Sequence, residues 1–577
     1  MTTSDDDQAA ADEAAKAAES ARAAAEAAQR KADELAVAAE AAQARAAAPA
    51  DEPPASPQSE IVAIVRAGYA FEGTAIEMGA LLDGEPVPDA QVRIPLAMLN
   101  RHGLVAGATG TGKTKTLQIL AEQIAANGVP VFAADIKGDL SGVATPGASS
   151  DKLLARTTSI GQDWQPLASP TEYFALGGIG MGIPVRASVD GFGPTLLAKV
   201  LGLNDTQESS LGLVFHYARK ASLPMIDLQD LRDVLTYLTG DEGKGELKAL
   251  GGLSAATVGV ILRELIAFAD EGADQFFGQP EISVSDFLRT APDGRGIVSL
   301  LEVPGVQDKP ALFSTFLMYL LSQLFKELPE VGDSDKPKLV FFFDEAHLLF
   351  ADASADFLDT ITQTVRLIRS KGVGIFFVTQ TPKDVPSDVL AQLGSRVQHQ
   401  LRAHTPDAAK ALKATVSTYP NTTYDLEEVL TSLGIGEAIV TVMSDKGAPT
   451  PVAWTRLRAP QGSMDPTPSE QIEAAVASSP LQAKYGTAVN PESATEMLGA
   501  NAAAVEAAAA AETSKKKEQQ EAERLQKEAD RLASKKSTSA AKPRSRSRRM
   551  SPVDRAVGEA SRTIARELIK NLFKKRR

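Results

Sequence analysis

The chain has 577 residues, of which 44% are hydrophobic and 23% are charged, and its formal net charge is −14 at pH 7. This composition is globular and the length allows more than one domain, which excludes a small disulfide-stapled module. The absence of cysteine excludes disulfides and thiol chemistry and fits a cytoplasmic protein, and no apolar stretch is long enough to predict an integral membrane segment. The acidic balance argues against a protein that coats nucleic acid with its whole surface.

The N-terminal segment is rich in alanine. Residues 1–50 contain 24 alanines, so helix propensity is high, but large apolar side chains that could anchor a core are too few. Pro53, Pro54 and Pro57 then interrupt the pattern. We expect residues 1–59 to form a helical or disordered extension; a coiled-coil partner is the alternative, although alanine at a helix seam buries little area.

Residues 60–460 have an ordinary globular composition and form the expected folded body. Short apolar runs separated by amphipathic stretches predict an α/β fold with a mostly parallel sheet covered on both faces. The expected strands are residues 103–106, 130–134, 296–302, 338–343, 373–378 and 396–401. The long span at about residues 140–335 is interpreted as a helical insertion, with helices at 194–203, 207–220, 227–238 and 255–270.

The first expected strand leads into a phosphate-binding loop that fits the pattern G-x-x-x-x-G-K-[ST]. The candidate nucleotide-binding residues are Gly107, Ala108, Thr109, Gly110, Thr111, Gly112, Lys113, Thr114 and Lys115. Backbone N–H groups in such a loop, together with the positive end of the following helix, bind phosphates. Lys113 would bridge the β- and γ-phosphates, and the Thr114 hydroxyl would ligate Mg²⁺. A glycine-rich turn beside a buried lysine is the alternative, but it does not require this order of strand, loop and helix.

Two carboxylates follow the expected strand at residues 338–343. Asp344 would hold Mg²⁺ through water, and Glu345 would orient and deprotonate the attacking water. Capping of the next helix is the alternative for this pair. We interpret His347 as an ordinary residue of the first helical turn.

Two further strand ends reach the same edge of the predicted sheet. Gln380 would sense the γ-phosphate or hold the lytic water. Asp135 would assist Mg²⁺ or water, with helix capping as the alternative.

An arginine should complete such a site by stabilising the charge that develops on the γ-phosphate, in cis or from a neighbouring subunit. The candidates are Arg366, Arg369 and Arg396. Arg369 follows an expected helix and precedes the strand that leads to Gln380, which suits presentation across a subunit boundary. A surface salt bridge is the alternative for each of the three.

These motifs together resemble the HerA/FtsK branch of RecA-like P-loop ATPases, and more narrowly the bacterial HerA-like helicase family. The strings at residues 201–207, 275–278, 365–374 and 393–398 are similar to signatures of that family. The resemblance implies a RecA-like fold and a hexameric ring of identical subunits, with ATP and Mg²⁺ bound between them and Arg369 acting in trans. It also implies DNA as a partner.

HerA itself works with a nuclease partner and carries an N-terminal β-barrel of roughly a hundred residues. Only about forty residues, 61–99, precede the first expected strand here. We therefore expect the barrel to be absent or reduced, which weakens the case for nuclease docking and for translocation.

The C-terminal extension divides into a linker with a charged helical segment, residues 461–534, and a basic tail, residues 535–577. The tail contains 15 Lys and Arg residues against three acids, a local net charge of +12. Its arginine- and serine-rich part cannot build a core, and its last residues predict an amphipathic cationic helix. We expect the tail to bind nucleic acid or dock on the ring; a membrane surface or a merely solvated end are the alternatives. The candidate contacts are Arg544, Arg546, Arg548 and Arg549.

The activity expected from these motifs is Mg²⁺-dependent ATP hydrolysis by a HerA-like ring, coupled to DNA binding or translocation. The alternative is a nucleotide-gated scaffold that recruits a partner without moving DNA. Glu345 favours turnover, because a pure nucleotide holder does not need a second carboxylate beside the first.

Overall fold

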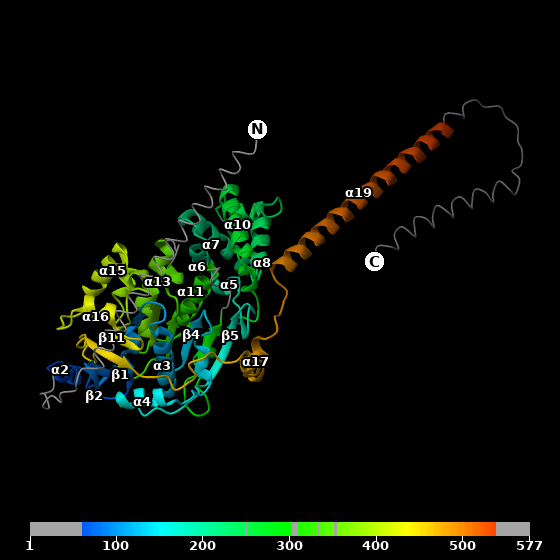
Figure 1. Cartoon of the computed structure of the whole chain (residues 1–577). Coiled ribbons are helices and arrows are strands. Elements are labelled where there is room, and N and C mark those ends of the chain that lie inside the picture. The colour runs from blue at the N-terminus through cyan, green and yellow to red at the C-terminus, as the bar shows by residue number, and fades with distance from the viewer. Residues whose placement is uncertain (1–59, 250, 303–309, 333, 351–354, 538–577) are drawn as a thin grey trace, which may run out of the picture. The chain divides into compact units, whose positions relative to one another are not determined.

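A computed structural model describes residues 60–249, 251–302, 310–332, 334–350 and 355–537 (Figure 1). The chain divides into two compact units, residues 1–211 with 263–489 and residues 212–262 with 490–577. The first unit contains the sheet and all the candidate site residues that the structure describes. Residues 1–59 and the tail residues Arg544, Arg546, Arg548 and Arg549 lie outside the described part.

The sheet of the first unit has 12 strands in the order β2-β1-β12-β11-β10-β3-β9-β8-β4-β7-β5-β6. All neighbours from β10 to β6 are parallel, whereas β11, β12, β1 and β2 are added antiparallel on the other side. The mostly parallel α/β fold expected from the sequence is therefore confirmed. The strands are β1 (Ala75–Asp83), β2 (Glu85–Pro95), β3 (Gly103–Ala106), β4 (Val131–Asp135), β5 (Thr171–Leu176), β6 (Ile183–Val185), β7 (Val298–Glu302), β8 (Leu339–Phe343), β9 (Val373–Thr379), β10 (Ser395–Gln398), β11 (Glu437–Thr441) and β12 (Ala453–Leu457).

The described residues also form helices, and many of these connect parallel strands, as crossover connections require. They are α2 (Glu60–Gly68), α3 (Lys113–Ala126), α4 (Asp151–Ser159), α5 (Val189–Phe192), α6 (Pro194–Val200), α7 (Asp205–Lys220), α8 (Leu228–Thr239), α9 (Lys244–Ala249), α10 (Ala255–Asp270), α11 (Pro310–Glu327), α12 (His347–Phe350), α13 (Ala355–Ile368), α14 (Ser387–Leu390), α15 (Pro406–Val416), α16 (Leu426–Ser432), α17 (Ser469–Ser478), α18 (Pro480–Tyr485) and α19 (Ala494–Ser537).

The central strands are buried on both faces, which explains their continuous apolar runs. Every residue of β8 and β9 is buried. Val340 and Phe342 of β8 join the core cluster that contains Leu117 of α3. Phe341 points to the other face, because side chains alternate along a strand, and there it stacks on Phe132 with ring centroids 4.4 Å apart.

Six strands, β1, β2, β5, β6, β11 and β12, were not expected from the sequence. Pro86 and Pro88 argue against a strand, but β2 lies at the edge of the sheet, where a missing N–H costs little. In the described residues before β3, β1 and β2 form a hairpin that joins the main sheet through β12, not a separate barrel. Residues 140–335 contribute β5, β6 and β7 to the sheet in addition to helices.

The second unit contains α8 and the long helix α19. The backbone N–H of Thr495 donates to Oδ1 of Asp230 (3.0 Å), and the Thr495 hydroxyl donates to Oδ2 of Asp233 (2.9 Å). These bonds attach the first turn of α19 to α8. From residue 499 to residue 531 every side chain of α19 is exposed.

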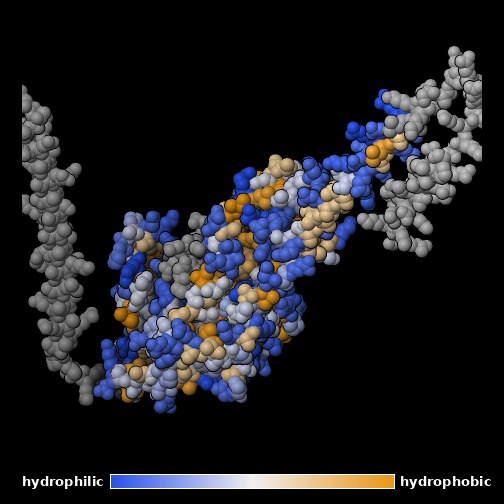
Figure 2. Space-filling view, turned by 90° about the vertical axis from the view of Figure 1, so that its right-hand side faces the viewer, coloured by the Kyte–Doolittle hydropathy of each residue, from blue (hydrophilic) through white to orange (hydrophobic). Residues whose placement is uncertain are grey.

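The face of the molecule seen in Figure 2 is mainly hydrophilic, with hydrophobic residues in small scattered groups. No helix in the described ranges is long and apolar enough to cross a membrane.

Candidate nucleotide site

The candidate site lies where four parallel strands end. β3 pairs with β9, β9 with β8, and β8 with β4, so the residues that follow these strands meet at one edge of the sheet. Those that follow β3, β4 and β8 line a cavity of about 470 Å³. Its wall includes Lys113 and Thr114 of the phosphate loop, Asp344 and Glu345 after β8, and Lys137 after β4.

The shape of the phosphate loop depends on close packing against the sheet. The N–H of Gly107 donates to the carbonyl of Thr379 (3.2 Å). A side chain at Gly107 would not fit, because an added Cβ would lie 2.4 Å from Cβ of His399. Gly112 has φ +109° and caps α3, so the amino end of that helix opens onto the cavity.

Lys113 rests on the loop itself. Its Nζ donates to the carbonyls of Gly107 (2.8 Å) and Ala108 (3.3 Å). Burial lowers the pKa of Lys113, and the charges of Glu345 and Asp344 oppose this effect. The ammonium thus lies within the loop that would cradle phosphates.

Asp344 and Glu345 are both buried, with 8% and 6% of their surface exposed. Burial and then the charge of Glu345 raise the pKa of Asp344 to about 7. Glu345 has φ +46°, a left-handed conformation that is uncommon outside glycine, and its N–H donates to Oδ1 of Asp344 (2.9 Å). Two adjacent carboxylates are therefore held in a strained turn at the carboxyl end of β8.

Glu345 has a cationic partner that the sequence did not reveal. Its Oε1 forms an ion pair with Nζ of Lys137. Its Oε2 lies 3.3 Å from Nδ1 of His347, within ion-pair distance if the imidazole is protonated but without hydrogen-bond alignment. The position of Lys137 just after β4, at the same sheet edge, was the available signal.

Asp135 is placed differently from the other candidates. Its carboxylate accepts N–H bonds from Gly138 (2.9 Å) and Leu140 (2.8 Å). It thereby caps the turn after β4, whereas Asp139 lines the cavity. Burial raises the pKa of Asp135, and the two backbone bonds oppose this.

The residues at this edge fit a magnesium ion shared with phosphates. Mg²⁺ prefers oxygen ligands and usually takes one or two from protein, the rest from phosphate and water. Thr114 and Asp344 line the same cavity and provide such oxygens. No group of three or more His, Asp or Glu residues in the described part of the chain could hold a metal by itself.

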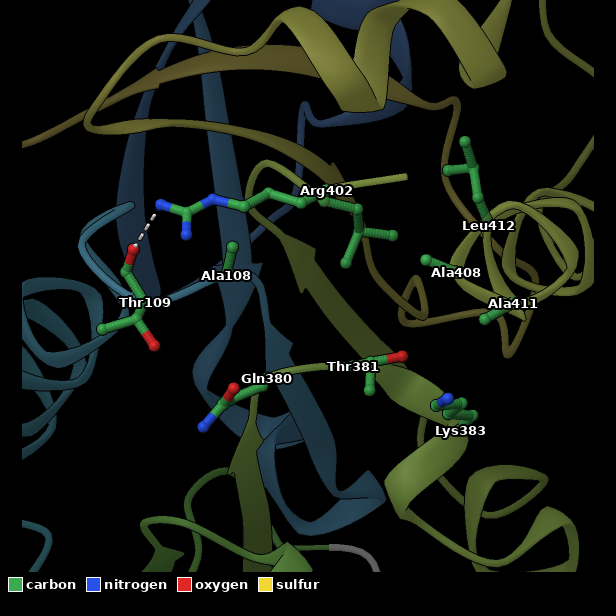
Figure 3. A pocket seen from close by; sticks show the side chains of 10 residues that line it. Ala108, Thr109, Gln380, Thr381, Lys383, Arg402, Ala408, Ala411 and Leu412 are labelled. Carbon is green, nitrogen blue, oxygen red and sulfur yellow. Dashed lines mark hydrogen bonds between the residues drawn. The ribbon is translucent and has the colours of Figure 1, made fainter. Parts of the chain in front are cut away.

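Gln380 faces a second, smaller cavity of about 240 Å³ that borders the phosphate loop (Figure 3). Thr109, Lys383 and Arg402 line it as well. Nη2 of Arg402 donates to the carbonyl of Thr109 (3.3 Å). The exposed Arg402 is a cation at the loop that sequence reasoning missed, although it follows β10 at the same sheet edge.

The chain matches the sequence model of a known protein family. The sequence model described as "Helicase HerA-like C-terminal" matches residues 81–577. The chain belongs to this family. The HerA-like resemblance seen in the motifs is thus confirmed.

Two relatives of this HerA-like chain are helicases by name. A probable helicase of Methanocaldococcus jannaschii is 24% identical over 362 residues, covering 59% of this chain and 64% of that protein. The DNA double-strand break repair helicase HerA of Saccharolobus solfataricus is 21% identical over 379 residues, covering 64% of this chain and 67% of that protein. The HerA-like chain therefore spans about two thirds of the length of these relatives.

Solved structures of conjugative coupling proteins are more distant. The bacterial protein TrwBdeltaN70 matches with a TM-score of 0.47 and 16% identity, covering 71% of this chain and 94% of that one. TrwB in complex with ADP and Mg²⁺ matches with a TM-score of 0.46 and 18% identity, covering 70% of this chain and 93% of that one. The fold assignment of the HerA-like chain rests on its own sheet and phosphate loop.

The arginine candidates of the HerA-like chain lie away from its own phosphate loop. Arg369 opens the turn Arg369–Lys371 just before β9, whereas Gln380 follows that strand. β9 has 7 residues, so the two are separated by roughly 23 Å at 3.3 Å per residue. Arg366 is exposed on α13, and Arg396 donates to the hydroxyl of Thr418 (2.6 Å). Arg369 therefore cannot act on phosphates bound by its own chain.

A buried histidine supports the HerA-like phosphate loop from below. Nε2 of His399 lies 2.9 Å from the hydroxyl of Thr116, and the backbone N–H of His399 donates to the carbonyl of Ala106 (2.7 Å). Burial and then the charge of Lys113 lower the pKa of His399 to about 4. The imidazole is thus neutral near pH 7. Nothing in the surrounding sequence distinguished it as a site residue.

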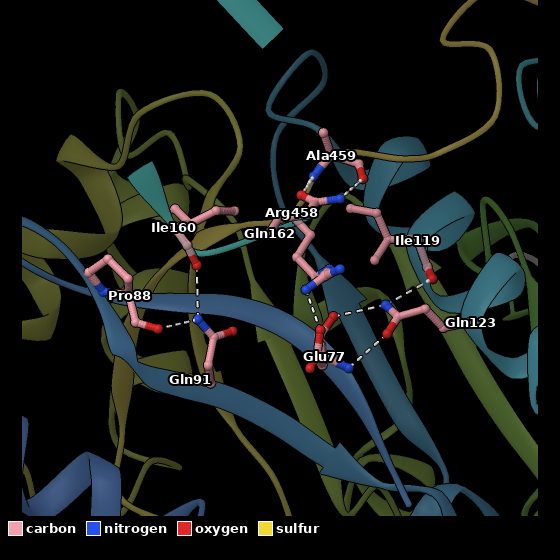
Figure 4. A network of polar contacts seen from close by, with 9 residues as sticks. All are labelled: Glu77, Pro88, Gln91, Ile119, Gln123, Ile160, Gln162, Arg458 and Ala459. Atoms are coloured by element: carbon pink, nitrogen blue, oxygen red, sulfur yellow. Dashed lines mark hydrogen bonds and ion pairs between the residues drawn. The ribbon is translucent and has the colours of Figure 1, made fainter. Parts of the chain in front are cut away.

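A polar network holds α3, the helix that follows the phosphate loop, in place (Figure 4). Nε2 of Gln123 in α3 donates to the carbonyl of Glu77 (2.8 Å), and the N–H of Glu77 donates back to the Gln123 amide oxygen (2.9 Å). The Glu77 carboxylate also pairs with Arg458, which follows β12. The network therefore ties α3 to β1 and to the end of β12.

Proposed function

We propose that the chain is an Mg²⁺-dependent ATPase that works as an assembly of identical subunits and couples hydrolysis to DNA binding or translocation. One observation carries the proposal. A single cavity contains the loop lysine Lys113, the hydroxyl of Thr114 and the paired carboxylates Asp344 and Glu345. Phosphate binding, metal binding and activation of water need these groups together.

The proposed chemistry uses the residues that lie around the phosphate loop. Lys113 leaves the carbonyls of Gly107 and Ala108 and donates to the β- and γ-phosphates. Thr114 and Asp344 would hold Mg²⁺, which neutralises phosphate charge when bound. Glu345 takes a proton from a water that attacks the γ-phosphorus, and the bond to the β-phosphate oxygen breaks. Gln380 would orient that water or sense the γ-phosphate.

The contact between Glu345 and Lys137 makes the activity gated. A carboxylate that is engaged by an ammonium is a weaker base toward water. The same ammonium lies in the cavity where a phosphate would compete for it. Hydrolysis therefore requires Lys137 to release Glu345.

Assembly and DNA binding belong to the same proposal. Arg369 lies at the sheet edge opposite its own phosphate loop, so a role in hydrolysis requires a neighbouring subunit. The family name and the relative named a DNA double-strand break repair helicase support DNA as the partner. We propose a hexamer on the basis of the family resemblance. The proposed role of the basic tail in DNA binding follows from its charge.

A nucleotide-gated scaffold is the second candidate function. The ion pair between Lys137 and Glu345 favours it, because a chain whose base stays paired would bind ATP and turn over slowly. The two functions differ in how they respond to DNA.

The test is the ATPase rate with and without single- and double-stranded DNA, on full-length protein whose mass in solution is measured. The ATPase proposal predicts a multimer whose rate rises with DNA and disappears in Lys113→Ala. A multimer that binds ATP but shows the same rate with and without DNA would contradict the motor and favour the scaffold.

A further inference from the structure

Two large apolar side chains are exposed at the mouth of the 470 Å³ cavity. Ile435 is 79% exposed and Met464 is 46% exposed, and both line that cavity. Ile435 lies between α16 and β11, and Met464 lies after β12. Leaving such side chains in water forgoes the free energy that burying them would provide.

The loops that carry these side chains are firmly attached to the phosphate loop and α3. The N–H of Gly436 donates to the carbonyl of Thr111 (3.2 Å). The carbonyl of Met464 accepts from Nζ of Lys115 (2.6 Å), and the carbonyl of Ser463 accepts from Nε2 of Gln118 (2.9 Å). The backbone is therefore held against the site while the two apolar side chains remain uncovered.

The hydrogen bonds of the loops that carry these side chains indicate which part of a ligand the side chains meet. Asp344 and Glu345 mark the γ-phosphate end, because they act on the metal and the attacking water. Met464 is attached instead to Lys115, the residue directly after the phosphate loop motif. The nucleoside of a bound nucleotide must lie at the end of the cavity that is remote from the γ-phosphate.

We propose that Ile435 and Met464 form a slot for the nucleobase of the bound nucleotide. The slot rests on the proposed nucleotide binding and adds its base subsite. A purine ring has two apolar faces. Contact of these faces with an isoleucine and a flexible methionine would remove apolar surface of the ring and of both side chains from water. Such contacts read the ring faces and not the polar edges, so the slot favours purines without selecting strongly between adenine and guanine.

The test compares a ligand that has a base with one that lacks it. Dissociation constants are measured by calorimetry for AMPPNP and for inorganic tripolyphosphate, both with Mg²⁺. Ile435→Ser and Met464→Ser should each weaken AMPPNP binding about tenfold, the effect of losing about 1.4 kcal/mol of apolar contact, and change tripolyphosphate binding less than twofold. Leu154→Ser is the matched control, because Leu154 is 42% exposed on α4 and does not line the cavity.

Three results would overturn the base slot. Equal losses for both ligands would mean that the loops only support the phosphate loop, and no loss for either would mean that the side chains do not touch the nucleotide. A change in assembly mass with unchanged AMPPNP binding would assign them to a subunit contact. Failure of the proposed function looks different, since then Lys113→Ala would leave the binding of both ligands intact.

Discussion

The ammonium of Lys137, at the end of β4, forms an ion pair with the carboxylate of Glu345, at the end of β8. The Glu345 side chain is 8% exposed and that of Lys137 is 41% exposed, so the carboxylate is buried and the ammonium is accessible to solvent. Burial alone would lower the pKa of Lys137, but the hydrogen bond to Glu345 and the nearby carboxylates raise it. Lys137 therefore keeps its charge across the neutral pH range.

Removing the partner of Glu345 should release the base. We expect Lys137→Ala to raise the ATPase rate without DNA several-fold and to reduce the ratio of stimulated to basal rate. Lys152→Ala, an exposed lysine on α4, should behave as wild type. A Lys137→Ala enzyme whose basal rate falls while its stimulation ratio is unchanged would show that Lys137 assists the chemistry and does not restrain it.

Arg369 should act across a subunit boundary. Arg369→Ala subunits and Lys113→Ala subunits should each be inactive alone, because one lacks the donated arginine and the other the loop lysine. Mixed before assay, they should recover part of the wild-type rate, since some interfaces then combine an intact loop with an intact arginine. Lys371→Ala, in the same turn, is the control and should stay active alone. No recovery in any mixture would contradict a role in trans.

The buried His102 should make the fold acid-sensitive. It is 2% exposed, its Nδ1 accepts the N–H of Ile375 (3.0 Å), and burial followed by the charges of Arg369 and Arg101 lowers its pKa from 6.5 to about 4. Between pH 6.5 and pH 4 the unfolded chain therefore binds a proton that the folded chain does not, so stability falls as pH falls through this window.

The slope attributable to one such histidine is about 1.4 kcal/mol per pH unit. We expect His102→Asn, which keeps an acceptor and tolerates the left-handed backbone at φ +62°, to flatten the dependence. Urea unfolding at pH 4.5, 5.5 and 6.5 measures it. Parallel curves for the wild type and the variant would refute the assignment.

The basic tail should contribute to DNA binding through phosphates. A chain that ends at residue 534 should bind duplex DNA more weakly and with a shallower dependence of log K on log salt, because fewer counterions are released. Fluorescence anisotropy at several salt concentrations gives both quantities. An unchanged slope would remove the tail from the DNA-binding role.

The centre of the site was predictable because it lies on buried parallel strands. The apolar runs that form β3, β8 and β9 stand out in the sequence, and parallel strands bring their carboxyl ends to one edge. Lys137 and Arg402 could not be assigned in the same way, because their partners Glu345 and Thr109 depend on strand order. Strand β2 was missed for another reason, since its prolines are tolerated only at an edge.

The exposed pair Ile435 and Met464 was beyond sequence reasoning as well. Isolated apolar residues in loops carry no periodic signal. Their significance comes from the hydrogen bonds that join Gly436 to Thr111 and Met464 to Lys115, across more than three hundred positions of the chain.

The most direct test of the central claim is a single substitution at Glu345. In Glu345→Gln the cavity keeps its shape and its loop lysine but loses the group that takes the proton from water. We expect this variant to bind ATP at least as tightly as wild type, to retain it on a filter with DNA present, and to hydrolyse it at less than about one hundredth of the wild-type rate. A variant that hydrolyses ATP at the wild-type rate would contradict the assignment of Glu345 as the catalytic base.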